Sequence, residues 1–301
     1  TVTAAGGVRR GLVDAGFTME KRPGFGSKRE CLAGQLTARP AREAQVASQR
    51  AEARLSGAPD GPVFVIGAGI AGMSAARALV DAGVEVTVCD RHGVAGGGAS
   101  GTPAGLLQPR PLNDGSLLAA FFHAAFEFAG RTYDALDEAW ISRGVLVLGR
   151  DAADGVRYQA LPGAETLDAA GCRAFSGVPI NDGGTWFAAG GVLDTRKVCA
   201  ALGDGAGTRF GISVTRLARQ TDGWRLHFDD SSVQEAAAVI LANGIDAMVL
   251  SGFSAMALSA NRGQVSYVAS TPMSDRLTAP ITFGGYLTPS ADGIHVLGAT
   301  F

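Results

Sequence analysis

Hydrophobic positions recur along the chain with two different periods, one typical of strands and one typical of helices. The run PVFVIG, residues 62–67, is apolar throughout, as in a strand buried inside a parallel sheet. Apolar residues then recur at helical spacing and predict a helix from Ile70 to about Ala82, with Gly83 just past its end. The run VEVTVC, residues 84–89, predicts a second strand. This order of strand, helix and strand indicates a parallel α/β unit.

Further elements are predicted downstream of this unit. Apolar positions at helical spacing mark a long amphipathic helix: Leu118, Phe121, Phe122, Ala125, Ala129, Tyr133 and Leu136. Short apolar runs predict strands over residues 144–149, 183–191, 224–228, 237–244, 263–270 and 293–301. We find no internal repeat. The pattern predicts an α/β fold that also contains α+β elements.

The first 60 residues divide into two parts of different composition. Residues 1–36 contain a helical pattern, a PGFG turn and the strand-like run ECLAGQL. The positions with helical spacing are Val8, Leu12, Val13 and Phe17. Residues 37–60 are rich in Ala, Arg and Glu and have few large apolar side chains, which is typical of a linker. The predicted boundaries are therefore 1–36, 37–60 and 61–301.

Composition and charge narrow the class of protein. Hydrophobic residues make up 47% and charged residues 18% of the 301 residues, which excludes a disordered polyelectrolyte. Residues 1–60 carry ten Lys/Arg and six Asp/Glu, whereas residues 61–301 carry sixteen and twenty-two. The basic leading segment is compatible with a phosphate-bearing partner, although a solvated surface is the simpler explanation. Its clustered cations are Arg9, Arg10, Lys21, Arg22, Lys28 and Arg29.

Cysteine usage and hydropathy exclude several other classes. Cys31, Cys89, Cys172 and Cys199 are far apart and form no CxxC pair, which argues against a zinc site, a redox dithiol and a secreted disulfide framework. No apolar run approaches the roughly 18 residues that span a bilayer. The start TVTAAGGVRR lacks an initiator Met and does not look like a signal peptide. We expect a cytoplasmic, monomeric chain without metal or membrane contacts, cut out of something longer.

The motif GAGIAG lies between the first predicted strand and the first predicted helix. Gly67 permits a tight turn, Gly69 lets the backbone approach a diphosphate, and Gly72 lets the helix pack closely on the strand. The helix start presents free N–H groups to the anion. Asp90 ends the second strand, eighteen residues beyond Gly72, where an acid accepts hydrogen bonds from ribose hydroxyls. The unit therefore predicts dinucleotide binding, and the acid argues against NADP.

Two further segments favour FAD over NAD. The stretch RHGVAGGGASGTPAGLLQP after Asp90 is nearly bare of large side chains, so its backbone could reach a second part of an extended cofactor. The strand AAVILANG ends in Ala242, Asn243 and Gly244, where a strand end meets the cofactor again. Each segment alone could be ordinary turn chemistry. Together and in this order they favour FAD.

These segments resemble a known family. GAGIAG, Asp90, GGASG with AGLL, GGVLDTRKVCAAL and VILANG resemble, in order, the FAD-binding segments of the D-amino-acid/glycine oxidase superfamily. More narrowly, GASGTPAGLLQPR, NRGQVSYV, GGYLTP and HVLGATF look like the oxidoreductase half of the MnmC family. Its bifunctional bacterial members make 5-methylaminomethyl-2-thiouridine in tRNA. VRRGLVDAGFTMEKRPGFGSKRECLAG resembles the end of the methyltransferase domain that precedes their FAD domain.

The resemblance implies a fold and a reaction. The fold is a Rossmann-like FAD-binding βαβ fold with a mixed-sheet substrate subdomain, preceded by a remnant of a class I methyltransferase domain. The reaction is FAD-dependent removal of the carboxymethyl group from 5-carboxymethylaminomethyl-(2-thio)uridine at the tRNA wobble position, which leaves 5-aminomethyl-(2-thio)uridine. The methyltransferase domain then methylates the freed amine with S-adenosylmethionine. This chain lacks that methyltransferase core and ends before the family's final segment, which puts the activity of the isolated fragment in question.

The motif positions also imply site residues. Tyr286, in GGYLTP, matches the place where glycine-oxidase-like enzymes bind the substrate carboxylate, and its alternative role is an aromatic on a sheet face. Arg262 could pair with the carboxylate or anchor its strand, and Gln264 follows it closely. His92 and His123 are interpreted as structural. The residues expected to bind FAD are Gly67, Ala68, Gly69, Ile70, Ala71, Gly72, Asp90, Arg91, Ala99, Ser100, Gly101, Gly105, Leu106, Val214, Ala242, Asn243 and Gly244.

Two other functions are compatible with the same motifs. The first is a free-standing glycine- or sarcosine-type amine oxidase or D-amino-acid oxidase, which would turn over its small substrate without tRNA. Residues 1–36 argue against it, because such an enzyme has no reason to carry them. The second is an inactive flavin-binding or scaffold fragment, which a colourless purified chain would favour.

Overall fold

The computed structural model describes most of the chain in two compact units, Thr1–Ala58 and Pro59–Phe301. The residues that it describes are 9–10, 12–13, 16–23, 30–36, 59–136, 138–252 and 259–300. The predicted linker therefore lies almost entirely outside the described residues, as do Val8, Lys28 and Arg29.

The first unit contains one antiparallel hairpin. Strand β1 (Phe17–Pro23) pairs with β2 (Glu30–Leu36), with Phe17 opposite Leu36 and Pro23 opposite Glu30. Phe17 was predicted to continue the preceding helical pattern, and this was wrong. Gly16 adopts a φ of 88°, and this left-handed conformation ends the helical residues before the strand begins.

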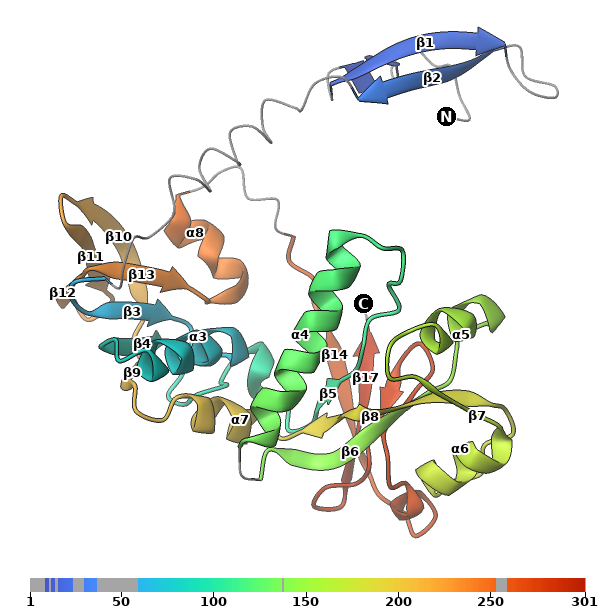
Figure 1. Ribbon diagram of the computed structural model, residues 1–301. Helices are drawn as coiled ribbons and strands as arrows, with labels where there is room; N and C mark the ends of the chain where they lie inside the picture. The colour runs from blue at the N-terminus through green and yellow to red at the C-terminus, as the bar shows by residue number, and fades with distance from the viewer. Residues whose placement is uncertain are drawn as a thin grey trace. The chain divides into compact units, whose positions relative to one another are not determined.

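A four-stranded parallel sheet forms one half of the second unit (Figure 1). Its order is β13 (Ala238–Leu241), β3 (Val63–Ile66), β4 (Val86–Asp90) and β9 (Gly207–Phe210). Helices α3 (Ile70–Asp81) and α7 (Thr195–Leu202) pack against each other and against one face. The opposite face is covered by an antiparallel sheet of β10 (Val214–Gln220), β11 (Gly223–Phe228) and β12 (Val233–Ala236).

The alternation of side chains along β3 explains this three-layer arrangement. Val65 faces the core under α3 and α7, whereas Phe64 and Ile66 face the core under the antiparallel sheet. Successive residues of a strand point to opposite faces, so an entirely apolar strand requires a cover on both sides. All four residues of β3 are buried.

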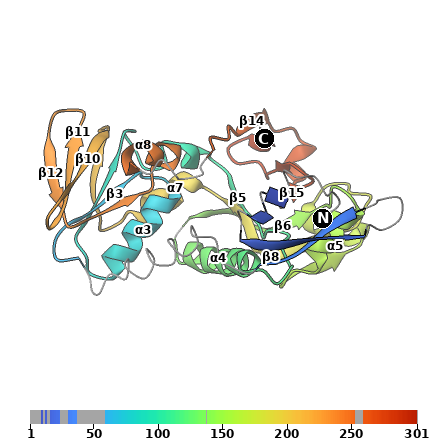
Figure 2. The same cartoon turned by 90° about the horizontal axis from the view of Figure 1, so that it is seen from above.

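The other half of the second unit is built on a mixed sheet of eight strands. The path runs β14 (Gln264–Ala269), β17 (Ile294–Thr300), β16 (Tyr286–Leu287), β15 (Ile281–Thr282), β6 (Trp140–Val147), β8 (Gly184–Leu193) and β5 (Gly105–Leu107), and β7 (Glu165–Leu167) also pairs with β8. β15 and β6 are parallel, whereas the other neighbours are antiparallel. Helices α5 (Ala152–Gln159) and α6 (Ala169–Ser176) lie at the β7 side of this sheet (Figure 1). Seen from above, α5 lies at the opposite end of the second unit from β10, β11 and β12 (Figure 2).

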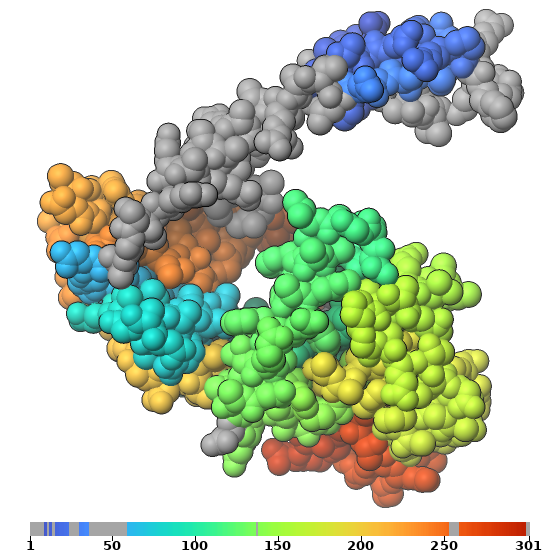
Figure 3. All heavy atoms as spheres, in the orientation of Figure 1, coloured from blue at the N-terminus to red at the C-terminus, as the bar shows by residue number. Residues whose placement is uncertain are grey.

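Helix α4 (Leu117–Asp134) connects the two halves of the second unit. It packs on β8, and Tyr133 near its end belongs to the core under α3 and α7. Figure 3 shows its atoms between those of α3 and those of the α5–α6 region. The predicted apolar face of this helix was wrong at two positions, because Leu118 is 56% and Phe121 63% exposed. Its buried residues are Ala119, Gly130 and Tyr133, so the prediction is confirmed at Tyr133, and the predicted Ala129 and Leu136 pack against the same core.

The predicted α/β fold class with its mixed-sheet subdomain is confirmed. Element boundaries moved by a few residues, since β4 starts at Val86 instead of residue 84 and β6 at Trp140 instead of residue 144. Among the helices that the structure describes, none combines the length and apolar character that a membrane span requires.

Candidate functional site

The turn between β3 and α3 brings three chain segments into close contact. Gly67 has a φ of 109°, and a Cβ there would overlap the carbonyl oxygen of Ala242 at the end of β13. A Cβ at Gly72 would overlap the carbonyl oxygen of Gly67. Both positions therefore require glycine for backbone packing, and the turn holds the start of α3 against the ends of β3 and β13.

The start of α3 has no side-chain cap from its own segment. Gly69 occupies the N-cap position with extended backbone and, as a glycine, has no side chain that could bond the first turn. The N–H of Ile70 donates instead to Ser100 Oγ at 3.1 Å, from a loop thirty residues away. The first N–H groups of a helix lack partners within the helix, so this bare start suits an anionic ligand.

The Asp90 carboxylate is already held by the protein. Its Oδ2 accepts the N–H of Ala68 at 2.7 Å, and its Oδ1 accepts the N–H of His92 at 2.8 Å. His92 Nδ1 lies a further 2.8 Å from Oδ1. An ionised carboxylate offers about four acceptor positions, so a further hydroxyl group can still bind. These contacts fix the orientation of Asp90 at the end of β4.

The ends of β3, β4 and β13 open into a cavity of about 690 Å³, which we name cavity A. This volume lies within the range of small-molecule sites. The predicted cofactor residues that line it are Gly67, Gly69, Ile70, Ala71, Asp90, Arg91, Ala99, Ser100, Val214, Ala242, Asn243 and Gly244. Its wall also contains residues that the sequence did not suggest: Ile212, Ser213, Thr215, Ile245, Asp246, Val249 and Leu250.

The other predicted cofactor residues lie outside the lining of cavity A. Ala68 is buried, and its carbonyl accepts the N–H of Gly96 at 2.8 Å. Gly72 is buried inside α3. Gly105 and Leu106 pair with β8 as part of β5 and line neither cavity.

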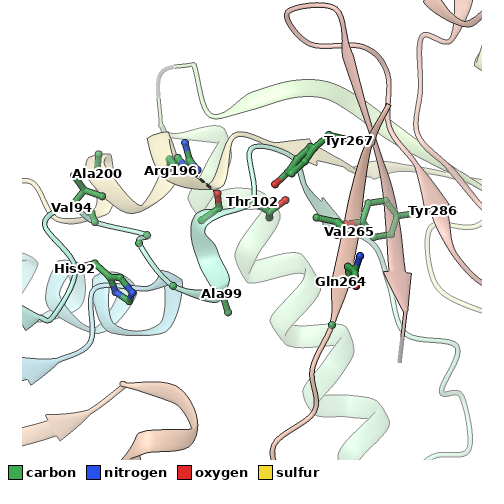
Figure 4. Close-up of a pocket in the computed structure, with 16 residues that line it drawn as sticks. His92, Val94, Ala99, Thr102, Arg196, Ala200, Gln264, Val265, Tyr267 and Tyr286 are labelled. Carbon is green, nitrogen blue, oxygen red and sulfur yellow. Dashed lines mark hydrogen bonds between the residues drawn. The ribbon is translucent and has the colours of Figure 1, made fainter. Parts of the chain in front are cut away.

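A second cavity of about 1050 Å³, which we name cavity B, adjoins the first. The two cavities share His92, Gly98 and Ala99 in their walls. Figure 4 shows cavity B between the glycine-rich loop with α7 on one side and β14 on the other. Gly101 lines it from the loop. An extended ligand could therefore occupy both cavities by passing along the loop from Gly98 to Gly101.

Two of the three predicted substrate residues line cavity B. Gln264 and Tyr286 line cavity B, together with Tyr267, whereas Arg262 is exposed and is not in its lining. Burial raises the pKa of Tyr286 above its ordinary value, and the neighbouring Tyr267 raises it further. Tyr286 therefore keeps its phenolic proton at neutral pH and can donate a hydrogen bond. Gly298 makes room for this ring, since a Cβ there would lie 2.7 Å from it.

Comparison with known proteins places this geometry in a family. A model of the family "FAD dependent oxidoreductase" matches residues 62–301, the segment that builds both cavities. The chain belongs to this FAD-dependent oxidoreductase family. A model of S-adenosyl-L-methionine-dependent methyltransferases matches residues 1–37.

Relatives of this oxidoreductase extend the comparison. The chain is 36% identical over 318 residues to the tRNA 5-methylaminomethyl-2-thiouridine biosynthesis bifunctional protein MnmC of Magnetococcus marinus, covering 99% of this chain and 47% of that protein. It thus spans about half the length of the curated relatives that it matches. Glycine oxidase from Geobacillus kaustophilus has a TM-score of 0.62 at 18% identity, covering 80% and 71% of the two chains. L-Proline dehydrogenase from P. horikoshii has a TM-score of 0.64 at 15% sequence identity, and the match covers 80% of this chain and 70% of that chain. These two structures support the fold alone.

The cavities of this oxidoreductase fit the FAD that its family uses. The buried Oδ1 of Asn243, at the end of β13, has no hydrogen-bond partner within the described structure, and Asn243 lines cavity A. A buried amide oxygen of this kind calls for a donor, which a bound cofactor can supply. Arg91 and Asp246 form an ion pair between two walls of cavity A. In the described part of the chain, no three His, Cys, Asp or Glu side chains gather as a metal site.

The motif DTRK, at the start of α7, has a role in this oxidoreductase that sequence analysis missed. Thr195 Oγ1 donates to the carbonyl oxygen of Ser100 at 2.8 Å and also contacts that of Thr102. Arg196 Nε donates to the carbonyl oxygen of Gly101 at 2.9 Å. Two adjacent side chains thus hold three consecutive carbonyls of the loop. The helix N-cap pattern of Asp194, which accepts the N–H groups of Arg196 and Lys197, was a local signal for the helix but not for this contact.

Proposed function

We propose that this chain binds FAD across cavities A and B and oxidises a secondary amine that carries a carboxylate. We further propose that it does so in a protein of the MnmC type, which removes the carboxymethyl group from 5-carboxymethylaminomethyl-(2-thio)uridine at the tRNA wobble position. The observation that carries the proposal is the continuity of the two cavities along one glycine-rich loop, in a chain whose relatives at 32–36% identity are named for tRNA modification.

Cavity A is the proposed site of the adenosine and diphosphate. The bare start of α3 would receive the diphosphate, because its N–H groups and the helix dipole favour an anion. Asp90 would accept a ribose hydroxyl with its remaining acceptor capacity, since the Ala68 and His92 contacts already orient its carboxylate. Asn243 would accept a donor from the cofactor through its unpaired Oδ1.

Cavity B is the proposed site of the flavin ring and the substrate. When bound, FAD supplies the two-electron oxidation of the N–CH2 bond next to the carboxylate to an imine, which water hydrolyses to the free amine and glyoxylate, while dioxygen takes up the two electrons. Tyr286 would donate its phenolic hydrogen to the substrate carboxylate, as its raised pKa permits. Gln264 would add an amide donor on the same wall.

The remaining part of the pathway is proposed from residues 1–37. Their match to a methyltransferase family and the word "bifunctional" in the relatives' names support a protein in which a separate domain methylates the freed amine with S-adenosylmethionine. That reaction would need a methyltransferase core beyond the residues of this chain. Because the substrate is tRNA, we propose that the protein works in the cytoplasm.

The test supplies the complete gene product with tRNA that contains 5-carboxymethylaminomethyl-2-thiouridine and omits S-adenosylmethionine. Nucleoside mass spectrometry is expected to detect 5-aminomethyl-2-thiouridine, with glyoxylate released in equal amount. An Asp90→Ala variant is the matched control, and it should lose bound flavin and product together. Unchanged tRNA from a flavin-loaded protein would reject the proposal. Turnover of glycine or sarcosine under those conditions would support a free-standing amine oxidase instead.

A further inference from the structure

Arg196 is the feature of cavity B that the mechanism above leaves unused. It is the second residue of α7, its side chain is exposed, and it lines cavity B opposite β14 (Figure 4). Its Nε–H donates to the carbonyl oxygen of Gly101 at 2.9 Å. This contact fixes the guanidinium beside the cavity and leaves its two terminal nitrogens.

The wall of cavity B is almost uncharged apart from this arginine. Among the described residues that line cavity B, Arg196 carries the only permanent charge, and none is acidic. The rest of the wall consists of glycine, small apolar residues and a few neutral polar groups. Because no carboxylate lines this wall, the cation has no competing anion there and is available to an anionic ligand.

The other described arginines differ from Arg196 in their partners or in their position. Many of them pair with a carboxylate, including Arg91, Arg143, Arg150 and Arg225. Arg196 forms no ion pair with any described carboxylate, and the same holds for several other described arginines, among them Arg262 and Arg276. Of the described arginines without an ion pair, Arg196 alone lines cavity A or cavity B. A guanidinium has five N–H donors, so four remain here for a ligand.

We propose that Arg196 binds an oxyanion of the substrate in cavity B. The inference rests on the proposed function, in which the substrate carries a carboxylate on the wobble base and phosphates on the RNA backbone. The two terminal nitrogens of Arg196 form a fork that matches either oxyanion with two parallel hydrogen bonds. Its position on the cavity wall makes it a stronger candidate for this contact than Arg262.

The experiment compares Arg196→Met with Arg196→Lys and with Arg276→Met, all in the complete gene product saturated with FAD. Arg276 is the matched control because it is exposed, has no described ion pair and lies outside both cavities. One arm titrates 5-carboxymethyluridine, which carries the carboxylate but no amine to oxidise, and follows the flavin spectrum. The other arm measures fluorescence anisotropy of an unmodified anticodon stem-loop RNA, which carries phosphates alone.

Arg196→Met is expected to lower the binding affinity for one of the two probes on the order of 10- to 100-fold, because it removes a charge-assisted hydrogen-bond pair. Arg196→Lys should restore part of the affinity, and Arg276→Met should leave it unchanged. Loss confined to 5-carboxymethyluridine identifies the carboxylate as the oxyanion, and loss confined to the stem-loop identifies a phosphate. Unchanged binding of both probes, or an equal loss in Arg276→Met, would overturn the inference.

The role of Arg196 and the proposed function can be refuted independently of each other. Wild-type protein that converts modified tRNA while Arg196→Met converts it equally well refutes the role of Arg196 alone. Wild-type protein that binds flavin but leaves modified tRNA unchanged refutes the proposed function. The flavin-to-protein ratio of each variant, measured after unfolding, separates a binding defect from a loss of cofactor.

Discussion

Among single residues, two helical glycines differ in the space that surrounds them. A Cβ at Gly72 would overlap the carbonyl oxygen of Gly67, whereas a Cβ at Gly155 in α5 would meet no atom within 4 Å. Neither glycine has a positive φ, so the difference between them is one of space. We expect Gly72→Ala to destabilise the second unit by about 1–3 kcal/mol or more, because the backbone must shift, and to weaken FAD binding at the displaced helix start.

Gly155→Ala is the control for this prediction. Alanine replaces glycine in a helix without a clash, so the free energy of unfolding should rise by roughly 0.5–1 kcal/mol. Urea unfolding of the two variants and of the wild-type protein, each with and without FAD, measures both effects. Equal stabilities for the two variants would show that the turn tolerates a methyl group and that its glycines are not required.

The cysteine thiols differ in burial and therefore in their expected reactivity. Burial raises the pKa of Cys89, which lines cavity A, to about 11, and that of Cys199 also to about 11. A raised thiol pKa favours the neutral form, so the reactive thiolate is scarce at neutral pH and grows only as the pH rises toward 11. Cys172 is buried as well, whereas Cys31 is half-buried.

We therefore expect iodoacetamide at about pH 8 to alkylate Cys31 well before the three buried thiols, and all four after unfolding. Peptide mass spectrometry of native and unfolded samples gives the site of each label. If Cys89 in the native protein were alkylated as fast as Cys31, this would contradict the burial of the Cys89 side chain.

At the scale of elements, α7 holds the loop that both cavities share. Thr195 is 4% exposed and its hydroxyl contacts the carbonyls of Ser100 and Thr102. Thr195→Val keeps the shape but leaves these carbonyls without their donor, which should cost about 1–3 kcal/mol of stability and lower the affinity for FAD. Thr132→Val in α4 is the control, since its hydroxyl bonds the Phe128 carbonyl at an exposed site and water can replace it.

Thermal unfolding and FAD titration of both variants check this prediction. The Thr195 variant should show a lower melting temperature and weaker flavin binding, and the Thr132 variant a small change in melting temperature alone. If flavin affinity in Thr195→Val matches that of the wild-type protein, the loop is positioned by other contacts.

The same loop shows what the sequence could predict and what it could not. The turn from β3 to α3 is local, so GAGIAG with its flanking apolar runs predicted the helix from Ile70 and the position of Asp90 at the cavity. The contact between Thr195 and Ser100 joins residues 95 apart in the sequence. No periodicity reports such a pairing. Helix α7 was missed for a related reason, since eight residues give too few turns for a clear helical period.

Of the two units of the molecule, Pro59–Phe301 contains every described residue that lines cavity A or cavity B. The first unit contributes no described side chain to either wall. FAD binding should therefore be a property of the second unit, and residues 1–58 should be dispensable for it. A ligand that binds only the folded state also raises the unfolding temperature with its concentration.

Deletion of residues 1–58 tests this division. The shortened chain should retain flavin at the same ratio to protein as the 301-residue chain, with an unchanged dissociation constant, and added FAD should raise the melting temperature of both to the same extent. An Asp90→Ala change in the shortened chain should abolish that rise, because it removes a carboxylate that holds the cavity A turn through Ala68 and that we expect to hold the ribose. A shortened chain that keeps its circular dichroism spectrum but takes up no flavin would mean that the leading unit helps to form the site.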